Sequence, residues 1–317
     1  MRIASLLPAA TEWICALGAA DALVARSHEC DAPEAITDRP AVTRATYDDS
    51  GSSAAIDAAV RDTLQQGLSL YSIDLDRLQA LAPDLIVTQD QCAVCAVSKS
   101  ELTNALAQTW DGTPPDVFSM QPRTLKEVLN TALRIGRTMG RTREAMRTVA
   151  GAEKQLHDLH VHMEYDRRTA DPDALPTVAC IEWLDPLMVA GHWMPDVVEM
   201  AGGRALLTEA GDASQTIAFD ALRDADPDVI ALLPCGFSVD QTRRDLSALT
   251  HQPGWSDLSA VRAGRVVLLD GNAYFNRPGP RLYRSIELMA SALHDVPLRT
   301  SPAPWELQAL GEGPPLG

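Results

Sequence analysis

The longest regular pattern of apolar positions lies in the middle of the chain, between Thr142 and Arg167. Apolar side chains recur there at steps of three and four residues, the period of one face of an α-helix: Met146, Val149, Ala152, Leu156, Leu159 and Met163. The stretch contains no proline, and its only glycine is Gly151. Thr142 suits a helix cap, and Glu144 suits the positive end of the helix dipole. The pattern therefore predicts one continuous helix over Thr142–Arg167.

Shorter apolar runs alternate with helical patterns on both sides of this predicted helix. Strands are expected at residues 3–7, 23–25, 85–87, 116–118, 177–181, 187–190, 229–231 and 265–269, and helices at 9–17, 54–66, 75–82, 98–107, 125–139, 197–201, 219–225 and 280–293. Strands that alternate with helices indicate parallel sheets covered by helices. The sequence therefore predicts an α/β protein with two Rossmann-like lobes, mostly parallel sheets and a single long α-helix between them.

The long helix also sets the expected domain boundaries. The N-terminal lobe is expected at residues 1–140, the inter-lobe helix at 141–168 and the C-terminal lobe at 169–300. We expect the function to lie in the cleft between the lobes; a long surface helix on one continuous domain is the alternative. Residues 301–317 are rich in proline and glycine, and a loosely ordered tail is expected there.

One plan occurs twice, once on each side of the long helix: a short helix, a Pro-Asp pair and a buried strand. The two copies span residues 75–92 and 219–236. Three positions match between them: Asp76 with Asp220, Pro83 with Pro227, and Asp84 with Asp228. A repeat on both sides of the helix favours two similar lobes. Pro-Asp is also a common helix stop, so incidental similarity stays open.

The charge of the chain excludes some classes of partner. The formal net charge is −16, which argues against nucleic-acid binding and against docking on anionic membranes. The apolar run that begins at Met1 is interrupted by Pro8, Thr11 and Glu12 before it reaches the length of a signal peptide. No later stretch approaches the length of a membrane span. These features predict a cytoplasmic protein without membrane insertion, or a periplasmic one if the start codon is mis-assigned.

Thiols and one histidine form the first candidate site. Cys92 and Cys95 have the Cys-x-x-Cys spacing that lets two thiolates reach one metal ion. His28 and Cys30 follow another predicted strand of the same lobe, so they are expected nearby. Such a ligand set suits zinc or an iron–sulfur cluster. Buried or incidental thiols are the competing interpretation.

Aromatic rings form the second candidate site. Aromatic residues make up only 5% of the chain, yet Trp183, Trp193, Tyr274 and Phe275 all fall on predicted loops or strand ends. Flat rings that line a cleft suit a large planar ligand, and ordinary packing beneath loops is the alternative. His192 is a candidate for ligating a metal or bonding a ligand, and Arg277 for holding an anionic group. Solvated surface positions are the alternative for both.

No catalytic template is present. The chain contains no Gly-x-Ser-x-Gly, no phosphate-binding glycine-rich loop and no His-Glu-x-x-His. We therefore expect a binding protein and not an enzyme.

These blocks of sequence together resemble a known family. The chain is similar to the substrate-binding proteins of ABC importers that have a long inter-lobe helix, those serving vitamin B12, haem and ferric siderophores. The likeness rests on Leu7–Glu12, Leu75–Val87, Val197–Gly203, Phe219–Ala231 and Asn272–Arg281. The order and spacing of the blocks are most similar to those of the vitamin B12-binding members.

The resemblance implies a class III periplasmic-binding-protein-like fold and cobalamin or another corrinoid as ligand. Pro8, Trp183, Tyr274 and Phe275 then fall at ligand-binding positions, with His192, Trp193 and Arg277 beside them. In the vitamin B12-binding members an acidic residue on each lobe docks onto arginines of the permease, and Asp76 and Asp220 match those positions.

Our hypothesis from the sequence is thus a two-lobed binding protein for a corrinoid or a related metal chelate. The first alternative is a cytoplasmic protein with a cysteine-liganded metal or iron–sulfur cluster and a sensing, storage or redox role. The second alternative is an enzyme that modifies the bound chelate.

Overall fold

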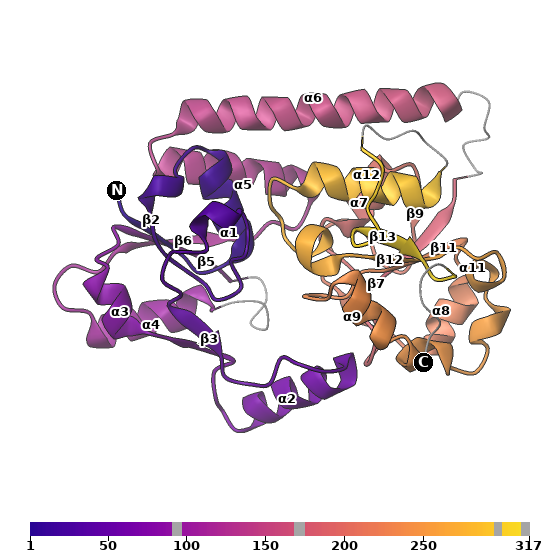
Figure 1. Ribbon diagram of the computed structural model, residues 1–317, viewed down its shortest axis with the longest axis horizontal. Coiled ribbons are helices and arrows are strands. Elements are labelled where there is room, and N and C mark those ends of the chain that lie inside the picture. Colours follow the sequence, from indigo (N-terminus) through magenta and orange to yellow (C-terminus); the bar gives the residue numbers. More distant parts are fainter. Residues whose placement is uncertain (91–96, 168–174, 295–299, 312–317) are drawn as a thin grey trace. The chain divides into compact units, whose positions relative to one another are not determined.

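The computed structural model describes residues 1–90, 97–167, 175–294 and 300–311 (Figure 1). The chain folds as two compact units. The N-terminal unit comprises Met1–Gly51, Ala55–Pro122 and Glu127–Gly151, and the C-terminal unit comprises Ser52–Ala54, Arg123–Lys126 and the described part of Ala152–Gly317. None of the described helices is both long and apolar enough to cross a membrane.

The N-terminal unit is built on a parallel sheet with the strand order β2-β1-β5-β6. The strands are β1 (Ile3–Ser5), β2 (Leu23–Arg26), β5 (Leu85–Gln89) and β6 (Asp116–Met120). Every residue of β1 and β5 is buried, as expected for central parallel strands covered on both faces. All four strands run the same way, so their carboxyl ends meet at one edge of the sheet.

Helices surround this sheet. They are α1 (Pro8–Ala16), α3 (Leu75–Ala80), α4 (Lys99–Thr109) and most of α5 (Leu125–Thr138), with two short 3-10 turns, η1 (Ala20–Ala22) and η2 (Glu34–Ile36). Proline at the first position of α1 suits a helix start, and α4 begins with a capping box between Ser98 and Glu101. Trp13, Leu78 and Leu102 are almost fully buried and form part of the core.

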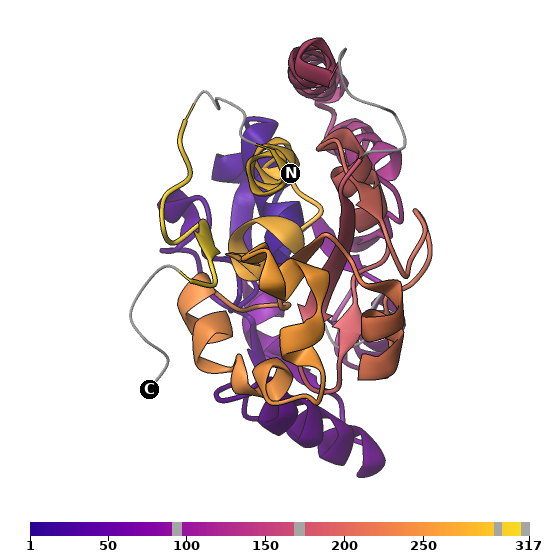
Figure 2. The same ribbon diagram turned by 90° about the vertical axis from the view of Figure 1, so that its right-hand side faces the viewer.

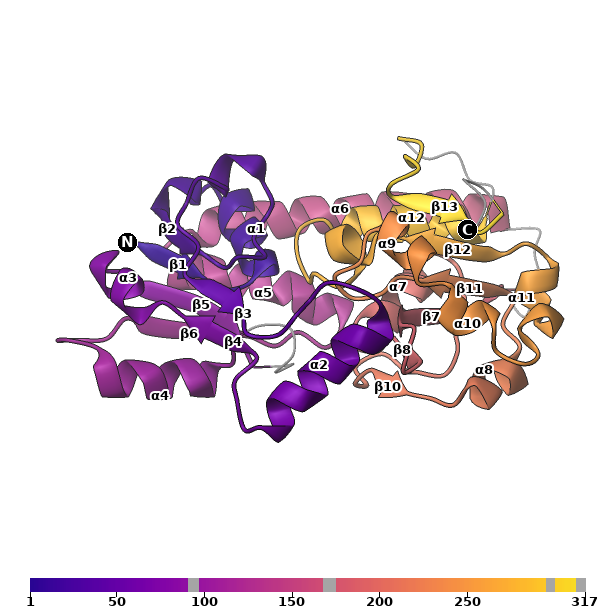
Figure 3. The same cartoon turned by 60° about the horizontal axis from the view of Figure 1, so that its bottom comes forward.

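A short antiparallel ribbon interrupts this α/β pattern. Its strands β3 (Thr43–Ala45) and β4 (Tyr71–Ile73) pair with Thr43 opposite Ile73, and α2 (Ser53–Gln65) lies between them in the chain. Figure 3 shows α2 standing apart from α3 and α4. The sequence predicted the helix but not the two strands, because three-residue strands in polar surroundings leave no periodic pattern.

The predicted long helix is confirmed as α6 (Thr142–Arg167), which Figure 1 shows as an unbroken ribbon. Its buried face is shifted by one residue near the start: Ala145 is fully buried, whereas Met146 is 60% exposed. Small residues explain the shift, because a Cβ on Gly136 of α5 would collide with the Ala145 Cβ. Residues up to Gly151 belong to the N-terminal unit and the following ones to the C-terminal unit.

The C-terminal unit contains a mixed sheet with the order β10-β8-β7-β11-β12-β13, and β9 also pairs with β7. Its strands are β7 (Thr177–Trp183), β8 (Met188–Val189), β9 (Arg204–Ala205), β10 (Gln215–Thr216), β11 (Val229–Leu232), β12 (Val266–Leu269) and β13 (Leu307–Ala309). The central strands β7, β11 and β12 are parallel, and β13 is antiparallel to β12. The predicted parallel sheet is therefore present, with antiparallel strands added on both sides.

The helices of this unit are α7 (Met194–Met200), α8 (Phe219–Ala225), α9 (Val239–Arg244), α10 (Ser247–Thr250), α11 (Ser259–Arg262) and α12 (Leu282–Leu293), with the short turn η4 (Trp255–Asp257). A buried apolar cluster joins the sheet to α8, α9, α10 and α11; it includes Ile181, Leu222 and Trp255. The sequence did not predict α9, α10 and α11, which have only four to six residues each.

Part of the predicted tail, residues 301–311, is described by the structure and contains a strand. Residues 307–309 form β13, in register with β12 so that Leu307 lies opposite Leu269. Glu306, just before the strand, is buried and forms an ion pair with Arg284 of α12. Strand pairing and this ion pair hold residues 300–311 in place despite their proline content.

Candidate functional site

Candidate binding residues of the C-terminal unit gather at the carboxyl ends of its parallel strands. Trp183 ends β7, Phe237 follows β11 after a short loop, and Tyr274 follows β12. Ligands of open α/β sheets usually bind at this edge. The edge is therefore the candidate site within this unit.

The loop after β12 has an unusual backbone that brings it close to the end of β11. Residues Gly271–Phe275 form a single π turn, η5, and Asp270 caps it by accepting a hydrogen bond from the Ala273 N–H at 2.6 Å. A Cβ on Gly271 would lie 2.6 Å from the Leu233 carbonyl oxygen, so only glycine fits. The Asn276 side chain donates to the same carbonyl oxygen at 3.0 Å. Such turns are frequent at functional sites.

Phe275 and Trp193 lie mostly inside the unit. The Phe275 side chain is fully buried, and only 8% of Trp193 is exposed. The Trp193 indole N–H donates to the Phe275 carbonyl oxygen at 3.2 Å, which ties the start of α7 to the π turn. These two rings support the site from beneath, and they offer a ligand little surface of their own.

Tyr274 packs at the surface end of the same turn. Its ring stacks on Trp305 with centroids 6.0 Å apart and an angle of 26°, and the Arg281 guanidinium lies 5.5 Å from its centroid. Burial, with the nearby Glu306 carboxylate, raises the pKa of Tyr274 to about 12, so the phenol stays protonated. Trp305 was not among the predicted site residues, because the proline and glycine near it in the sequence indicated a loosely ordered tail.

Trp183 is partly exposed at the end of β7. Its ring centroid lies 5.4 Å from that of Phe237, at an angle of 57°. The strands also join here through the backbone, since the Cys235 N–H donates to the Glu182 carbonyl oxygen at 3.0 Å. Trp183 thus presents part of an indole at the predicted edge.

His192 occupies a strained position next to Trp193. Its φ is +54°, a left-handed conformation that is uncommon for histidine, and its N–H donates to the Asp212 carbonyl oxygen at 2.6 Å. The imidazole stacks on Trp193, and its buried Nδ1 has no hydrogen-bond partner among the described residues. Burial, and secondarily Arg123, lowers the pKa of His192. The imidazole is therefore neutral near pH 7.

Arg277 is largely buried, and its guanidinium donates to the Asn272 side chain at 2.8 Å. Both residues belong to the loop after β12, so this contact adds to the bonds that fix the loop. Arg277 is placed at the predicted edge, and an anion-binding role for it stays a prediction.

In the N-terminal unit, Pro8 and His28 lie at the carboxyl ends of β1 and β2. Pro8 is partly exposed at the start of α1. His28 Nδ1 is 2.8 Å from the Thr43 hydroxyl, its ring is 5.8 Å from that of Tyr71, and its buried Nε2 has no partner among the described residues. Burial lowers the pKa of His28, with Asp49 opposing and Arg26 adding to the shift. At this edge the described residues thus include a neutral imidazole with the Tyr71 ring beside it.

The predicted cysteine metal site gains no support. Cys30 is buried and its sulfur accepts a hydrogen bond from the Thr11 hydroxyl at 3.0 Å. Cys92 and Cys95 lie outside the described residues. Among the side chains that the structure describes, no three from His, Cys, Asp or Glu are placed to hold a metal ion.

The two predicted docking residues occupy equivalent places. Asp76 lies in the first turn of α3 and Asp220 in the first turn of α8, and both side chains are exposed. Asp220 pairs with Arg223 at 2.8 Å on the same helix. Their exposure leaves them accessible, and docking itself stays a prediction.

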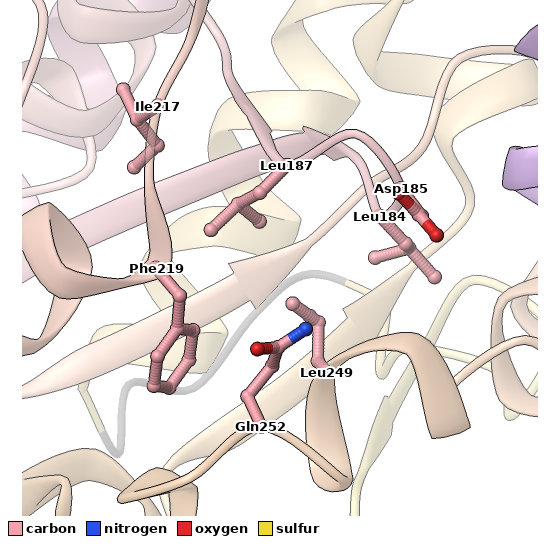
Figure 4. A pocket seen from close by; sticks show the side chains of 7 residues that line it. All are labelled: Leu184, Asp185, Leu187, Ile217, Phe219, Leu249 and Gln252. Carbon is pink, nitrogen blue, oxygen red and sulfur yellow. The ribbon is translucent and has the colours of Figure 1, made fainter.

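Two small cavities occur within single units. One, of about 190 Å³, lies beside the end of β7 in the C-terminal unit, where Figure 4 shows the Gln252 amide among Leu187, Phe219 and Leu249. The other, of about 230 Å³, adjoins Met1 and Arg141 in the N-terminal unit. Pockets for drug-sized ligands usually measure about 300–1,000 Å³, so neither cavity suits a macrocycle.

Two α/β units with parallel central strands and a long helix between them in the chain are the features of two-lobed binding proteins. A family model for periplasmic binding proteins matches residues 3–273, and the chain belongs to this family. The predicted family and the predicted α/β fold of the class III type are confirmed. The family and its neighbours are binding proteins, so the expectation that the chain is not an enzyme is confirmed as well.

Solved structures show the same fold. A periplasmic haem-binding protein from Pseudomonas aeruginosa is 20% identical, with a TM-score of 0.70 and 97% of each chain covered. RhuT, a periplasmic haem-binding protein from Roseiflexus sp. RS-1, is 21% identical, with a TM-score of 0.65 and 93% of this chain and 98% of that one covered. BtuF, the periplasmic vitamin B12-binding protein of Vibrio cholerae, is 19% identical, with a TM-score of 0.63 and coverage of 92% and 96%. A search of curated protein sequences finds no match.

The predicted cytoplasmic location is wrong. The matching family and the similar structures are those of periplasmic proteins. The prediction rested on the apolar run after Met1, which is shorter than a signal peptide requires. In the structure, that run contains β1, a buried strand of the folded unit, so its length carries no information about export.

Proposed function

We propose that this chain is the substrate-binding protein of an ABC importer and that it binds a macrocyclic metal chelate of the haem or cobalamin type. Membership of the periplasmic binding protein family supports the binding role. Similar structures are those of haem-binding and vitamin B12-binding proteins. The cysteine-liganded metal protein is the weaker candidate, because the family model that matches the chain describes binding proteins of another kind.

The observation that carries the proposal is the set of rings at the carboxyl edge of the C-terminal sheet. Trp183, Phe237 and Tyr274 follow three adjacent parallel strands, β7, β11 and β12. Trp183 is the partly exposed ring of this set, whereas Phe237 and Tyr274 are buried. Large conjugated ligands gain dispersion and stacking energy from an accessible ring, typically about 0.5–1.5 kcal/mol per pair beyond area burial. The π turn holds Tyr274 in place before a ligand arrives, and the hydrogen bond from the Asn276 side chain to the Leu233 carbonyl oxygen fixes the end of the turn. A preformed site loses less entropy on binding.

Imidazoles supply the polar contact in this proposal. His192 and His28 are both neutral near pH 7 because burial lowers their pKa values. A neutral imidazole is the form that ligates metals or bonds to a ligand amide or carboxyl group. We assign that role to His192, which stacks on Trp193 beside the π turn, with His28 as the corresponding group of the N-terminal unit.

The proposed partner is an ABC permease that docks through Asp76 and Asp220. Both carboxylates are exposed, and each lies in the first turn of the helix that begins one copy of the internal repeat. Charge reversal at both positions, Asp76→Lys with Asp220→Lys, is expected to abolish uptake in a transport assay while ligand binding in solution stays at the wild-type level. Wild-type uptake by this variant would remove the docking assignment.

Titration of the purified protein tests the binding role. Haemin and cyanocobalamin are added separately, and the visible spectrum and melting temperature are followed. We expect saturable binding of one of them with a shifted spectrum, and stabilisation of about 2.7 kcal/mol when the free ligand is at 100 times its Kd. Trp183→Ala should weaken binding about 3- to 10-fold.

Trp110 provides the matched control. It follows α4 in the N-terminal unit, away from the carboxyl ends of the strands, and its indole N–H donates to the Thr113 carbonyl oxygen at 3.2 Å. Trp110→Phe should bind like the wild type. If neither haemin nor cyanocobalamin changes the spectrum or the melting temperature of the wild type, the proposed ligand class is wrong.

A further inference from the structure

Residues 303–309 reach the same edge of the C-terminal sheet from the opposite direction. Strand β13 is antiparallel to β12, so the residues just before it lie at the carboxyl end of β12. The Asp270 N–H donates to the Glu306 carbonyl oxygen at 3.1 Å, directly before the π turn. Figure 2 shows this segment, in yellow, along the margin of the unit. Trp305 therefore lies beside the candidate site.

A buried ion pair anchors this segment. Glu306 is only 6% exposed and accepts two hydrogen bonds from the Arg284 guanidinium, at 2.9 and 2.7 Å. It also accepts one from the Ala303 N–H at 2.9 Å. Paired guanidinium and carboxylate groups fix orientation as well as distance. The backbone on both sides of Trp305 is thus held, and the indole is presented from a rigid position.

The Trp305 side chain is exposed although the anchor beneath it is buried. Its relative exposure is 57%, whereas Trp13, Trp193 and Trp255 are each 8% exposed or less. One face lies against Tyr274, at 6.0 Å and 26°, and the Arg281 guanidinium lies on the same tyrosine ring. A single exposed tryptophan is ordinary on a protein surface. This one continues a row of rings at a sheet edge where ligands bind.

The row covers four adjacent strands of the sheet. Trp183 ends β7, Phe237 and Tyr274 follow β11 and β12, and Trp305 precedes β13, so the four rings are ordered along the sheet. Three strand spacings separate its ends, which corresponds to about 14 Å. Phe237 and Tyr274 are buried, so the accessible indoles are at the two ends of the row, with Trp183 partly exposed and Trp305 exposed. A ligand that uses both ends must be broad and flat.

We propose that Trp305 is a ligand-stacking residue contributed by the C-terminal strand, and that it selects a macrocycle with an open flat face. This inference rests on the proposed function and names the ligand within it. An iron porphyrin has such faces. A cobalamin carries axial groups and amide side chains that project above and below its ring, so it stacks less well on an indole. The expected ligand is therefore of the porphyrin type.

The test measures haemin and cyanocobalamin affinities for the full chain and three Trp305 variants. Trp305→Phe keeps a ring, Trp305→Leu keeps apolar area without a ring, and Trp305→Ala removes both. We expect the haemin Kd to rise about 3- to 10-fold for Trp305→Ala, with Trp305→Phe between that variant and the wild type and Trp305→Leu close to Trp305→Ala. Trp110→Phe should match the wild type. Melting temperatures check that each variant is folded.

The outcomes separate this inference from the proposed function. If the wild type binds neither haemin nor cyanocobalamin, the proposed ligand class is wrong, and this inference is wrong with it. Haemin binding with an unchanged Kd in Trp305→Ala leaves the proposed function standing and removes Trp305 from the site. Preference of the wild type for cyanocobalamin, with Trp305 variants unaffected, also overturns the inference. Equal effects of Trp305→Leu and Trp305→Phe would show that apolar area, and not ring stacking, is the cause, which contradicts it.

Discussion

The two copies of the internal repeat are alike at one end of their strands and different at the other. Before β5 and before β11, a residue with positive φ precedes the Pro-Asp pair: Ala82 at +42° and Asp226 at +37°. The aspartates then act in the same way. Asp84 accepts a hydrogen bond from the Arg2 N–H at 2.6 Å, and Asp228 accepts one from the Thr177 N–H at 2.8 Å.

Each aspartate therefore holds the amino end of the neighbouring parallel strand, β1 in one unit and β7 in the other. At the carboxyl ends the likeness stops. Among the described residues, the N-terminal unit places the Ser27, His28 and Thr43 cluster there, with the Tyr71 ring 5.8 Å from that of His28. The C-terminal unit places Trp183, Phe237 and Tyr274. The amino ends have the same structural role in both units, so they are similar, whereas the proposed function assigns ligand contact to the carboxyl ends, which differ.

The largest effect is expected at the carboxyl end of the C-terminal sheet, from Gly271→Ala. The added Cβ would lie 2.6 Å from the Leu233 carbonyl oxygen, and backbone atoms cannot move away as a side chain would. Overpacking of this kind costs about 1–3 kcal/mol, and we expect the upper part of that range together with a large loss of ligand affinity. Urea denaturation and haemin titration measure the two quantities.

Gly151→Ala is the matched control for Gly271→Ala. Gly151 lies within α6, and nothing lies within 4 Å of a Cβ built there. Alanine should stabilise the helix by about 0.5–1 kcal/mol and leave binding unchanged. If Gly271→Ala were as stable as the wild type, the close approach of the π turn to β11 would not be a real constraint.

Smaller and similar effects are expected at the two amino ends. Asp84→Ala and Asp228→Ala each remove a charged acceptor from a strand N–H, worth about 1–2 kcal/mol for exposed carboxylates that water partly replaces. Asp228 also accepts from the Thr177 hydroxyl at 2.7 Å, so its variant should be the less stable of the two. Urea midpoints measure both. A negligible effect at one position and a large one at the other would show that the copies are not equivalent.

These elements differ in how far the sequence predicts them. The period of three and four residues predicted α6, and the matched Asp84 and Asp228 predicted the repeat, since both signals are local. The burial of the Phe275 side chain was not predictable from the sequence. It depends on Trp193 and on the contact between Gly271 and Leu233, and these residues are far apart in the chain. Local patterns report residue type and period, and they do not report which face meets the core.

The position of Trp305 shows the same limit of local sequence patterns, here for an ordered segment that composition did not indicate. Proline and glycine near it indicated a loose tail, yet pairing with β12 and the Glu306–Arg284 ion pair hold it in place. The residues that hold this segment lie in α12 and β12, and no local sequence pattern indicates these contacts. The predicted roles of Pro8, His192 and Arg277 stay predictions.

Acid should weaken the C-terminal repeat through Asp228. Hydrogen bonds from the Thr177 N–H and hydroxyl hold the pKa of Asp228 below its usual value. The stability it contributes is present above the unfolded pKa, near 3.9, and is lost as pH falls through the lower folded pKa. The stability difference between wild type and Asp228→Asn should therefore shrink below about pH 4. A difference that stays constant between pH 6 and pH 3 would contradict this hydrogen-bonded carboxylate.

The smallest effect concerns two imidazoles, His28 in the N-terminal unit and His192 in the C-terminal unit. Burial lowers the pKa values of His28 and His192, so the folded state binds these protons less readily than the unfolded chain does. Their contribution to stability is present above the unfolded pKa, near 6.5, and is lost as pH falls through the folded values below it. The melting temperature of the wild type should fall more between pH 7.5 and pH 5.5 than that of His28→Gln/His192→Gln, with each single variant in between. Equal falls in all four proteins would mean that both rings take up protons as freely in the folded units as in the unfolded chain. One polar feature, a partly buried imidazole with a lowered pKa, would then no longer be shared by the two units.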